Sequence, residues 1–443
     1  MAHFDPNWKK TWEDKLVSAA DAVSLIEPGQ TVFAGVWTST PLTLSAALAA
    51  RAGELTGITI LNALSLFPWN KPETLAHYRV VSVYTSPLDR QSARAGQIEY
   101  LPVVRWRQGR LPPGMQSDVA MLPISPPDEK GWCSFGTAVW FGPTYAEQVQ
   151  TLIGEVHPEF IRTSGDNRVH MSQFARVVEH VPVPAGAMAI PPRSEETELA
   201  ANVICTLVAN EIVYDGATLQ FGIGDVSAAL PIFLGERKEL GVHTELLPGG
   251  VVDLVAQGVV TGRQKAIDVG KVVAAAAAQL RPDEVAFIDG NPVFEMRDFT
   301  YTDDLRNLLQ FENFVAVNNA LAVDLTGNVS SETMGPQIFS GAGGQSAFAI
   351  AASTAADGSV IVLPSSQLVS GARHTRIVGG HLPGTVVTVH RGYVDYVVTE
   401  QGIARLTGKS IRERMTELIS IAHPECRAEL RKEAERIYGM TIE

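Results

Sequence analysis

Apolar residues in this chain gather in short runs that are separated by patterns typical of helices. The runs at residues 31–35, 57–61, 80–84 and 119–124 are short and largely apolar, and they predict buried strands. The stretch 42–52, between the first two runs, predicts a helix. Buried strands that alternate with helices indicate an α/β fold with a mainly parallel sheet.

Residues 1–26 predict one helical lead-in to the first strand. Trp8, Trp12, Leu16 and Ala19 recur at helical spacing, so a helix would place them on one face.

A proline-rich segment predicts a linker near the middle of the chain. Pro182, Pro184, Pro191 and Pro192 cannot continue a helix, and their missing N–H groups disfavour a central strand. An acidic run then begins a new helix at Glu195, where the helix dipole favours negative charge. We therefore expect two domains, residues 1–190 and residues 191–443.

The second half of the chain repeats the pattern of the first half. Residues 28–35 have a counterpart in residues 215–222, with the same spacing between the glycines. Residues 119–131 match residues 315–327, because the Val, Asp and Gly of the two segments have the same spacing. The same alignment sets residues 57–61 opposite the segment that ends at Glu245. We therefore expect two similar open α/β domains with mainly parallel sheets and an active site in the crevice between them. Glu245 should lie at the C-terminal end of a strand, where such sheets bind ligands.

Composition and charge narrow the range of partners. The chain has 443 residues, 45% of them hydrophobic and 19% charged, which is an ordinary balance for a globular protein of two or three domains. A formal net charge of −13 argues against nucleic acid and anionic membranes as partners. The three cysteines, Cys133, Cys205 and Cys426, lie far apart and predict buried, reduced thiols of a cytoplasmic protein. No apolar stretch predicts a signal peptide or a membrane span.

One carboxylate stands out as a candidate for chemistry. Glu245 follows an apolar run and precedes a turn at Pro248-Gly249-Gly250. A carboxylate at the end of a strand beside glycines is well placed to meet a ligand. The alternative is a solvated glutamate at an ordinary turn between a strand and a helix.

Two glycine-bearing stretches accompany this carboxylate. Residues 218–225 end an apolar run in Gly222-Ile223-Gly224, and residues 339–345 place three glycines before a helix of small residues. Glycines before a helix can open the backbone so that N–H groups face an anion. The alternative for the first stretch is a tight turn, and the alternative for the second is close approach to another segment of the chain.

Five motifs in order resemble those of the acetyl-CoA hydrolase/transferase family of CoA-transferases. The resemblance runs from about Trp12 to about Leu430, and the motifs are Gln220-Phe221-Gly222-Ile223-Gly224, His243-Thr244-Glu245-Leu246, residues 318–327, residues 340–345 and residues 394–402. Members of this family include 4-hydroxybutyrate, butyrate, succinate and itaconate CoA-transferases.

The resemblance implies a role for each matching residue. Glu245 is implied to be the nucleophile that carries the acyl group and then CoA. The residues implied to line the CoA and thioester side are Gln220, Phe221, Gly222, Ile223, Gly224, Leu321, Ser340, Gly341, Gly343 and Gly344. The resemblance implies acyl-CoA and small carboxylic acids as substrates, no permanently bound cofactor, no metal, and a homodimer or a higher homo-oligomer.

Other residues compete for these roles. His243 is a structural histidine or a partner of Glu245, and Glu332 and Glu400 are rival carboxylates. Asn291 and Asn318 match family positions near the site, with a turn and a cap as their alternative roles.

The chain also departs from the pattern of similar proteins. Pro248-Gly249-Gly250 stands where they commonly carry Ser-Asp-Gly, and Asp303-Asp304-Leu305 stands where they often carry Asn-Asp-Pro. These departures bear on the substrate. Two alternative functions are considered. The protein is an acyl-CoA hydrolase that uses the same glutamate, or it binds acyl-CoA without catalysis.

Overall fold

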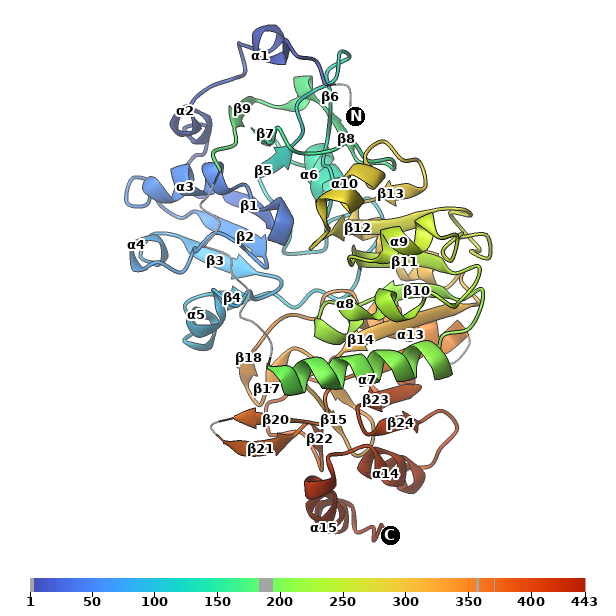
Figure 1. Ribbon diagram of the computed structural model, residues 1–443. Coiled ribbons are helices and arrows are strands. Elements are labelled where there is room, and N and C mark those ends of the chain that lie inside the picture. The colour runs from blue at the N-terminus through green and yellow to red at the C-terminus, as the bar shows by residue number, and fades with distance from the viewer. Residues whose placement is uncertain (1–3, 183–193, 356–357, 370, 443) are drawn as a thin grey trace. The chain divides into compact units, whose positions relative to one another are not determined.

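The computed structural model describes residues 4–182, 194–355, 358–369 and 371–442 (Figure 1). The chain divides into two compact units. The first comprises residues 1–190 with 273–304, and the second comprises residues 191–272 with 305–443. The predicted proline-rich linker lies largely outside the described residues, so the linker and the boundary near residue 190 stay predictions.

The first unit is built on a seven-stranded sheet with the order β4-β3-β2-β1-β5-β7-β9. All neighbouring strands in it are parallel. Leu44 and Leu48 of α3 are fully buried in the same core cluster as Val32 and Ile60 of the sheet. The strands are β1 (Thr31–Val36), β2 (Thr59–Ala63), β3 (Arg79–Ser82), β4 (Glu99–Tyr100), β5 (Val119–Ile124), β7 (Thr151–Val156) and β9 (Arg176–Glu179), with β6 (Trp132–Ser134) and β8 (Arg168–His170) as a separate antiparallel pair. The helices are α1 (Trp8–Thr11), α2 (Ala19–Val23), α3 (Leu42–Ala50), α4 (Pro72–Leu75), α5 (Arg90–Arg94) and α6 (Gly142–Gln148).

The prediction of one helix over residues 1–26 is wrong. The segment forms two short helices, α1 and α2, and Leu16 between them makes a parallel bridge to Val177. Val17 donates its N–H to the Val177 carbonyl at 3.0 Å, so pairing with β9 replaces the helical hydrogen bonds there. The tertiary contact with β9 therefore determines the backbone conformation around Leu16 more strongly than the helical spacing of apolar residues does.

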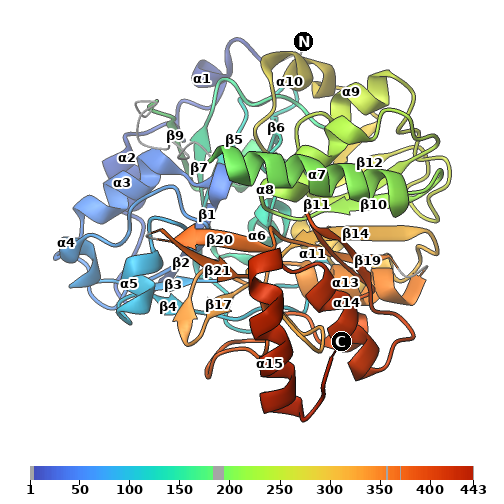
Figure 2. The same ribbon diagram turned by 60° about the horizontal axis from the view of Figure 1, so that its bottom comes forward.

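The second unit contributes the run β11-β10-β14-β19-β23-β24 to an eight-stranded sheet. Strands β11 to β23 pair in parallel, and β24 is antiparallel to β23. Helix α7 packs along β23 and β24 (Figure 1). Helix α13 packs on β14 and β19, and α14 packs beside α15 (Figure 2). The strands of the sheet are β10 (Thr218–Phe221), β11 (Gly241–Leu247), β14 (Phe314–Asn319), β19 (Ser359–Val362), β23 (Tyr396–Thr399) and β24 (Gly402–Arg405). The helices are α7 (Glu195–Glu211), α8 (Asp225–Ala229), α9 (Val251–Ala256), α12 (Leu305–Leu308), α13 (Gln345–Ala355), α14 (Ile411–Ser420) and α15 (Arg427–Tyr438). Smaller strands are β15 (Ala322–Asp324), β16 (Val329–Ser330), β17 (Thr333–Met334), β18 (Gln337–Ile338), β20 (Ser366–Val369), β21 (Ala372–Thr375) and β22 (Ile377–Val378).

The two sheets share their strand order. The run β2-β1-β5-β7-β9 of the first unit has its counterpart in β11-β10-β14-β19-β23 of the second, and both runs are parallel throughout. The predicted fold class, two similar α/β domains with mainly parallel sheets, is therefore confirmed. The crevice between them stays a prediction.

Residues 273–304, which were expected in the second domain, pack with the first unit. They carry β12 (Val272–Ala277), α10 (Pro282–Ile288), β13 (Phe294–Met296) and α11 (Phe299–Thr302). Trp140 donates its N–H to the Ala275 carbonyl at 3.0 Å and accepts the N–H of Phe299 at 2.6 Å. The ring of Phe299 also contacts Trp106 and Phe141, with centroids 4.5 and 4.9 Å apart.

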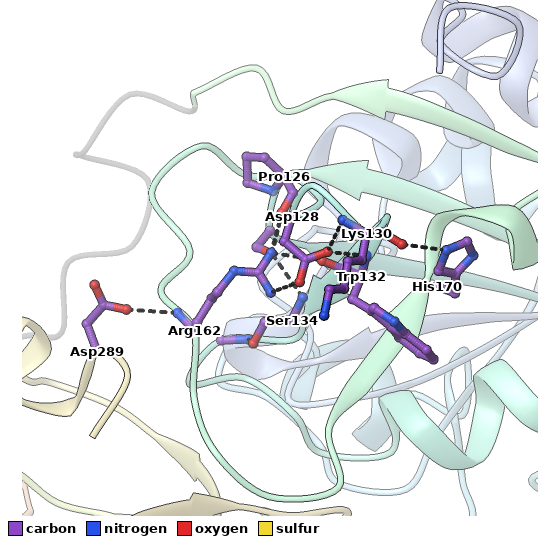
Figure 3. A network of polar contacts seen from close by, with 10 residues as sticks. Pro126, Asp128, Lys130, Trp132, Ser134, Arg162, His170 and Asp289 are labelled. Carbon is purple, nitrogen blue, oxygen red and sulfur yellow. Dashed lines mark hydrogen bonds and ion pairs between the residues drawn. The ribbon is translucent and has the colours of Figure 1, made fainter. Parts of the chain in front are cut away.

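Arg162 holds this segment at a second point (Figure 3). Its N–H donates to the Asp289 carboxylate at 3.1 Å, and its carbonyl accepts the N–H of Gly290 at 2.7 Å. The guanidinium donates to the Trp132 carbonyl at 2.8 Å and lies 3.6 Å from the Asp128 carboxylate. One arginine thus links the loop at β6 to the segment after α10.

The three cysteines are free thiols, as predicted. Cys133 and Cys205 are buried and Cys426 is half-buried. Burial raises the pKa of the Cys133 thiol and keeps it protonated. Within the described part of the chain, no helix has both the length and the apolar character needed to cross a membrane.

Two glycines of the first unit offer a matched test of backbone strain. Gly29 and Gly35 both have φ of +82°, but a Cβ on Gly35 would lie 2.1 Å from the Ser39 carbonyl oxygen. A Cβ on Gly29 would meet no described atom within 4 Å. We expect Gly29→Ala to lower the free energy of unfolding by about 1–2 kcal/mol, the cost of a left-handed alanine. Gly35→Ala should cost roughly 3 kcal/mol or more, since the backbone must also move. Urea unfolding of both variants measures this, and equal losses would contradict it.

Candidate active site

Glu245 lies in the interior of a fully buried strand. All seven residues of β11 are buried, and Glu245 stands two positions before its last residue, Leu247. The residue is only 8% exposed. The alternative of a solvated glutamate at a turn is therefore wrong, and the strand continues slightly beyond the carboxylate.

The carboxylate of Glu245 meets the second glycine stretch. Gly344 donates its N–H to Oε2 of Glu245 at 3.1 Å. Burial raises the pKa of Glu245 to about 7, although the Gly344 hydrogen bond acts in the opposite direction. A carboxylate with such a pKa is divided between its neutral and charged forms near neutral pH.

The first glycine stretch is shaped by two asparagines at the end of β14. A Cβ on Gly222 would lie 2.5 Å from the Asn318 side-chain oxygen, and a Cβ on Gly224 would lie 2.4 Å from the Asn319 side chain. Asn319 donates to the Ile223 carbonyl at 3.3 Å. Glycine is required here because another segment of the chain approaches closely, an alternative that had been considered for the second glycine stretch and not for this one.

Amide and hydroxyl groups fix β10 against its two neighbours. The Gln220 and Asn318 side chains form a reciprocal pair, with hydrogen bonds of 2.9 and 3.2 Å, and both are buried. The Thr244 hydroxyl donates to the Phe221 carbonyl and accepts the Phe221 N–H, both at 3.1 Å. These bonds hold the strand that precedes the Gly222 turn in register with the strand that carries Glu245.

The loop before α13 is held from its own side. Ser340 donates its hydroxyl to the Ser331 carbonyl at 2.6 Å, and the Ser340 N–H bonds to the Glu332 carbonyl at 3.2 Å. The Glu332 carboxylate accepts the Thr388 hydroxyl at 2.9 Å. These contacts give Glu332 a role in shaping the loop whose Gly344 reaches Glu245.

The remaining candidates differ in their surroundings. His243 is completely buried, with its ring 5.1 Å from that of Phe311 and Nδ1 4.0 Å from the Asp268 carboxylate. Glu400 accepts two hydrogen bonds from Ser365, one from its N–H at 2.8 Å and one from its hydroxyl.

Three predicted positions show mainly local contacts. Asn291 accepts the Val293 N–H at 3.0 Å, which is the turn that was weighed as an alternative for it. Phe221 is 1% exposed, so its side chain belongs to the core. Leu321 is half-buried and donates its N–H to the Ser330 carbonyl at 2.9 Å.

At each departure, the residue that still matches the family pattern has a local structural role. Gly250 has φ of +88°, a conformation that favours glycine, and is the N-cap of helix α9. Asp304 is buried and accepts the Gln108 N–H at 3.0 Å within the first unit.

Sequence reasoning missed the parts played by Thr244 and Asn319. Thr244 alternates with His243 and Glu245 along β11, so strand periodicity could have assigned it to the opposite face. Asn319 follows Asn318 at the end of β14, but no sequence pattern shows that its side chain meets the turn at Gly224.

Models of two protein domains match this chain over most of its length. The acetyl-CoA hydrolase/transferase N-terminal domain matches residues 4–188, and the C-terminal domain of the same family matches residues 283–434. The chain belongs to the acetyl-CoA hydrolase/transferase family. The predicted family and enzyme class, a CoA-transferase, are confirmed.

Relatives of known activity cover almost the whole chain. The 4-hydroxybutyrate coenzyme A transferase of Clostridium kluyveri is 32% identical over 97% of this chain and 99% of its own length. The butyryl-CoA:acetate CoA-transferase of Anaerostipes caccae is 32% identical over 97% of this chain and 98% of its own. Among solved structures, RipA from Yersinia pestis matches with 28% identity and a TM-score of 0.88, covering 98% of this chain and 100% of that one.

The buried carboxylate should make the stability of this CoA-transferase depend on pH. Unfolding returns the pKa of Glu245 from about 7 to its usual value near 4.3. The favourable contribution of the neutral form is therefore complete below about pH 4 and is lost as pH rises through 7. We expect Glu245→Gln to be more stable than the wild type above pH 7, by on the order of 1–3 kcal/mol, with the difference disappearing near pH 4.

Urea unfolding of both proteins across this pH range measures the difference. Glu400→Gln serves as the control, since hydrogen bonds from Ser365 already satisfy that carboxylate. A difference between Glu245→Gln and the wild type that is independent of pH would contradict the assignment.

Proposed function

We propose that this chain moves CoA from an acyl-CoA to a carboxylic acid by ping-pong chemistry, with Glu245 as the nucleophile. The observation that carries this proposal is the buried Glu245 carboxylate with the Gly344 N–H bound to it at 3.1 Å. The substrates named for the relatives, 4-hydroxybutyrate, butyryl-CoA and acetate, give the substrate class: short carboxylic acids and their CoA thioesters. Itaconate is a further acceptor that the family resemblance suggests.

Glu245 attacks the donor in the first half of the reaction. Its carboxylate oxygen bonds to the acyl carbonyl carbon of the donor, the C–S bond breaks, and CoA leaves as a thiolate. The products are an acyl-glutamyl anhydride and the thiolate. The thiolate then attacks the glutamyl carbonyl carbon, and the bond from that carbon to the bridging oxygen breaks. The donor's acyl group departs with this oxygen as the first carboxylate, and a glutamyl-CoA thioester remains.

The second half runs these steps in reverse with another acid. The acceptor carboxylate attacks the glutamyl carbonyl and displaces CoA thiolate. The thiolate then attacks the acyl carbonyl of the new anhydride, which forms the new acyl-CoA and restores the Glu245 carboxylate. No proton or electron is consumed in the cycle.

The surroundings of Glu245 suit this chemistry in two ways. Burial removes water that would solvate the carboxylate and hydrolyse the anhydride. When the glutamyl carbonyl becomes tetrahedral, the Gly344 N–H can donate to the developing oxyanion, since it already bonds to Oε2. One such donor contributes roughly 3–4 kcal/mol to stabilisation of the transition state.

We assign the CoA-lining role to the two glycine stretches, each of which forms a loop. Gly222, Ile223 and Gly224 form a turn against Asn318 and Asn319, and at its two glycines only backbone atoms fit. Ser340, Gly341, Gly343 and Gly344 form the second loop, and Gly343 has φ of +54°. Gln220, Phe221 and Leu321 support these loops from β10 and from the segment before β15. We also propose that the protein forms a homodimer and acts in the cytoplasm.

A covalent adduct tests the nucleophile directly. Incubation of the wild type with acyl-CoA alone should leave CoA attached to the peptide that carries Glu245. Glu245→Ala should lose several orders of magnitude in turnover, because the carboxylate that forms the intermediate is gone. Intact mass spectrometry with peptide mapping locates the adduct, and a steady-state assay measures the loss.

The matched control replaces a carboxylate outside the proposed chemistry. Glu400→Gln should keep both the adduct on Glu245 and most of the turnover. A CoA adduct on Glu332 or Glu400, or an active Glu245→Ala variant, would overturn the mechanism.

A hydrolase that uses the same glutamate is the second candidate, since the name of the family includes both activities. In a transferase, water must hydrolyse the glutamyl-CoA thioester more slowly than the acceptor carboxylate attacks it. We expect loss of acyl-CoA to be at least roughly tenfold faster with added acetate than without, a gap of about 1.4 kcal/mol in activation free energy. Consumption of acyl-CoA at one rate in both conditions would identify a hydrolase.

A further inference from the structure

Three potential metal ligands converge in the first unit, on residues that the proposed reaction does not use. Glu155 lies in β7, His157 directly follows that strand, and His180 directly follows β9. The two strands are parallel, with Val156 opposite Glu179, so the residues after each strand are neighbours. Glu155 and His157 are close in the sequence, and the pairing of β7 with β9 brings His180 to them.

The ligating atoms of the three side chains point at one place. Nδ1 of His180 lies 2.7 Å from Oε1 of Glu155, and Nε2 of His157 lies 3.4 Å from the same oxygen. All three atoms lie within 4.8 Å of one another. The imidazole rings stack with centroids 3.7 Å apart and 20° between their planes.

The carboxylate is held in place by the backbone. Glu155 is completely buried, and its Oε2 accepts the N–H of Leu44 near the start of α3 at 3.1 Å. Oε1, the other carboxylate oxygen, lies on the side of the histidines.

One nitrogen in this cluster lacks a partner. Nε2 of His157 is buried and makes no hydrogen bond among the described residues, because its approach to Glu155 has poor geometry. A buried polar atom without a partner costs free energy. A cation between the three atoms would satisfy it.

We propose that Glu155, His157 and His180 bind a divalent transition metal ion such as Zn²⁺. Two imidazole nitrogens and one carboxylate oxygen are a donor set that zinc accepts, at about 2.0–2.2 Å from the ion. Tetrahedral ligands at that length stand roughly 3.3 Å apart, and the two distances to Oε1, 2.7 and 3.4 Å, lie on either side of it. The fourth position goes to water, since the histidine side chains keep 18% and 14% of their surface exposed.

Binding of the ion has a defined structural effect. Nδ1 of His180 must be unprotonated to bind it, so the proton of the neutral ring lies on Nε2. The ion then ties the end of β9 to β7 and, through the Leu44 N–H on Glu155, to the start of α3. The site is thus a structural brace, independent of the chemistry at Glu245.

Cobalt provides a spectroscopic test on the full chain. Protein treated with a chelator and desalted is titrated with Co²⁺, and the visible absorption of nitrogen-bound Co²⁺ should saturate at one equivalent. Added Zn²⁺ should displace it. Zinc should also raise the thermal unfolding midpoint of the chelator-treated wild type.

Matched variants locate the site. His157→Gln and His180→Gln each remove a ligating imidazole but keep an amide that can bond to Glu155, and each should weaken metal binding at least tenfold. His77→Gln removes an exposed histidine near α4 and should bind Co²⁺ as the wild type does. Zinc should raise the unfolding midpoint of His77→Gln but not that of the other two.

The wild type alone can overturn the proposal. The absence of a saturable Co²⁺ spectrum, or of any zinc-dependent rise in its unfolding midpoint, would leave the cluster as a hydrogen-bonded carboxylate and two histidines. A Co²⁺ spectrum that survives in both His157→Gln and His180→Gln would place the metal elsewhere and overturn it too. Neither readout uses the CoA-transferase assay, so the proposal stands or falls independently of Glu245.

Discussion

The parallel pairing of β10 with β11 and β14 determines where the residues of the candidate site lie. Thr218 of β10 stands opposite both Gly241 and Phe314, and the ladder continues to Phe221 opposite Val317. This register brings the turn after β10 against the asparagines that end β14. It also places Thr244 of β11 where its hydroxyl bonds both backbone groups of Phe221. A shift of one residue would turn Glu245 to the opposite face of the sheet.

Burial of Glu245 imposes a compromise between stability and reactivity. A charged carboxylate in a buried strand is costly, so the pKa rises and part of the population is neutral near pH 7. The same lack of water makes the ionised form a stronger nucleophile, because fewer hydrogen bonds must be broken before attack. The single N–H from Gly344 offsets a part of the cost. Glu245 therefore stabilises the fold less than an apolar residue at the same position would. Such a loss of stability is expected if Glu245 is the nucleophile that we propose.

Much of the fold could be predicted from local patterns, and the failures share a physical cause. The apolar runs that became β1, β2, β3 and β5 were evident, because a buried parallel strand is apolar on both faces. The helix expected over residues 1–26 did not form because Leu16 pairs with Val177, a contact between distant segments that spacing cannot reveal. Glu245 was selected from a motif, whereas the reason for glycine at 222 and 224 required the positions of Asn318 and Asn319. The cluster of Glu155, His157 and His180 was invisible for the same reason.

The first unit is assembled from two stretches of chain separated by part of the second, and this has a consequence for its synthesis. Residues 1–190 leave the ribosome well before residues 273–304, which supply the partner of Trp140 and the ring of Phe299. At 5–20 residues per second, the wait lasts roughly several seconds. During that time Trp106, Trp140 and Phe141 have no Phe299 to cover them. Newly made chains should therefore pass through a stage in which chaperone binding and aggregation compete with folding, even though each finished sheet is built from short, nearly sequential crossovers.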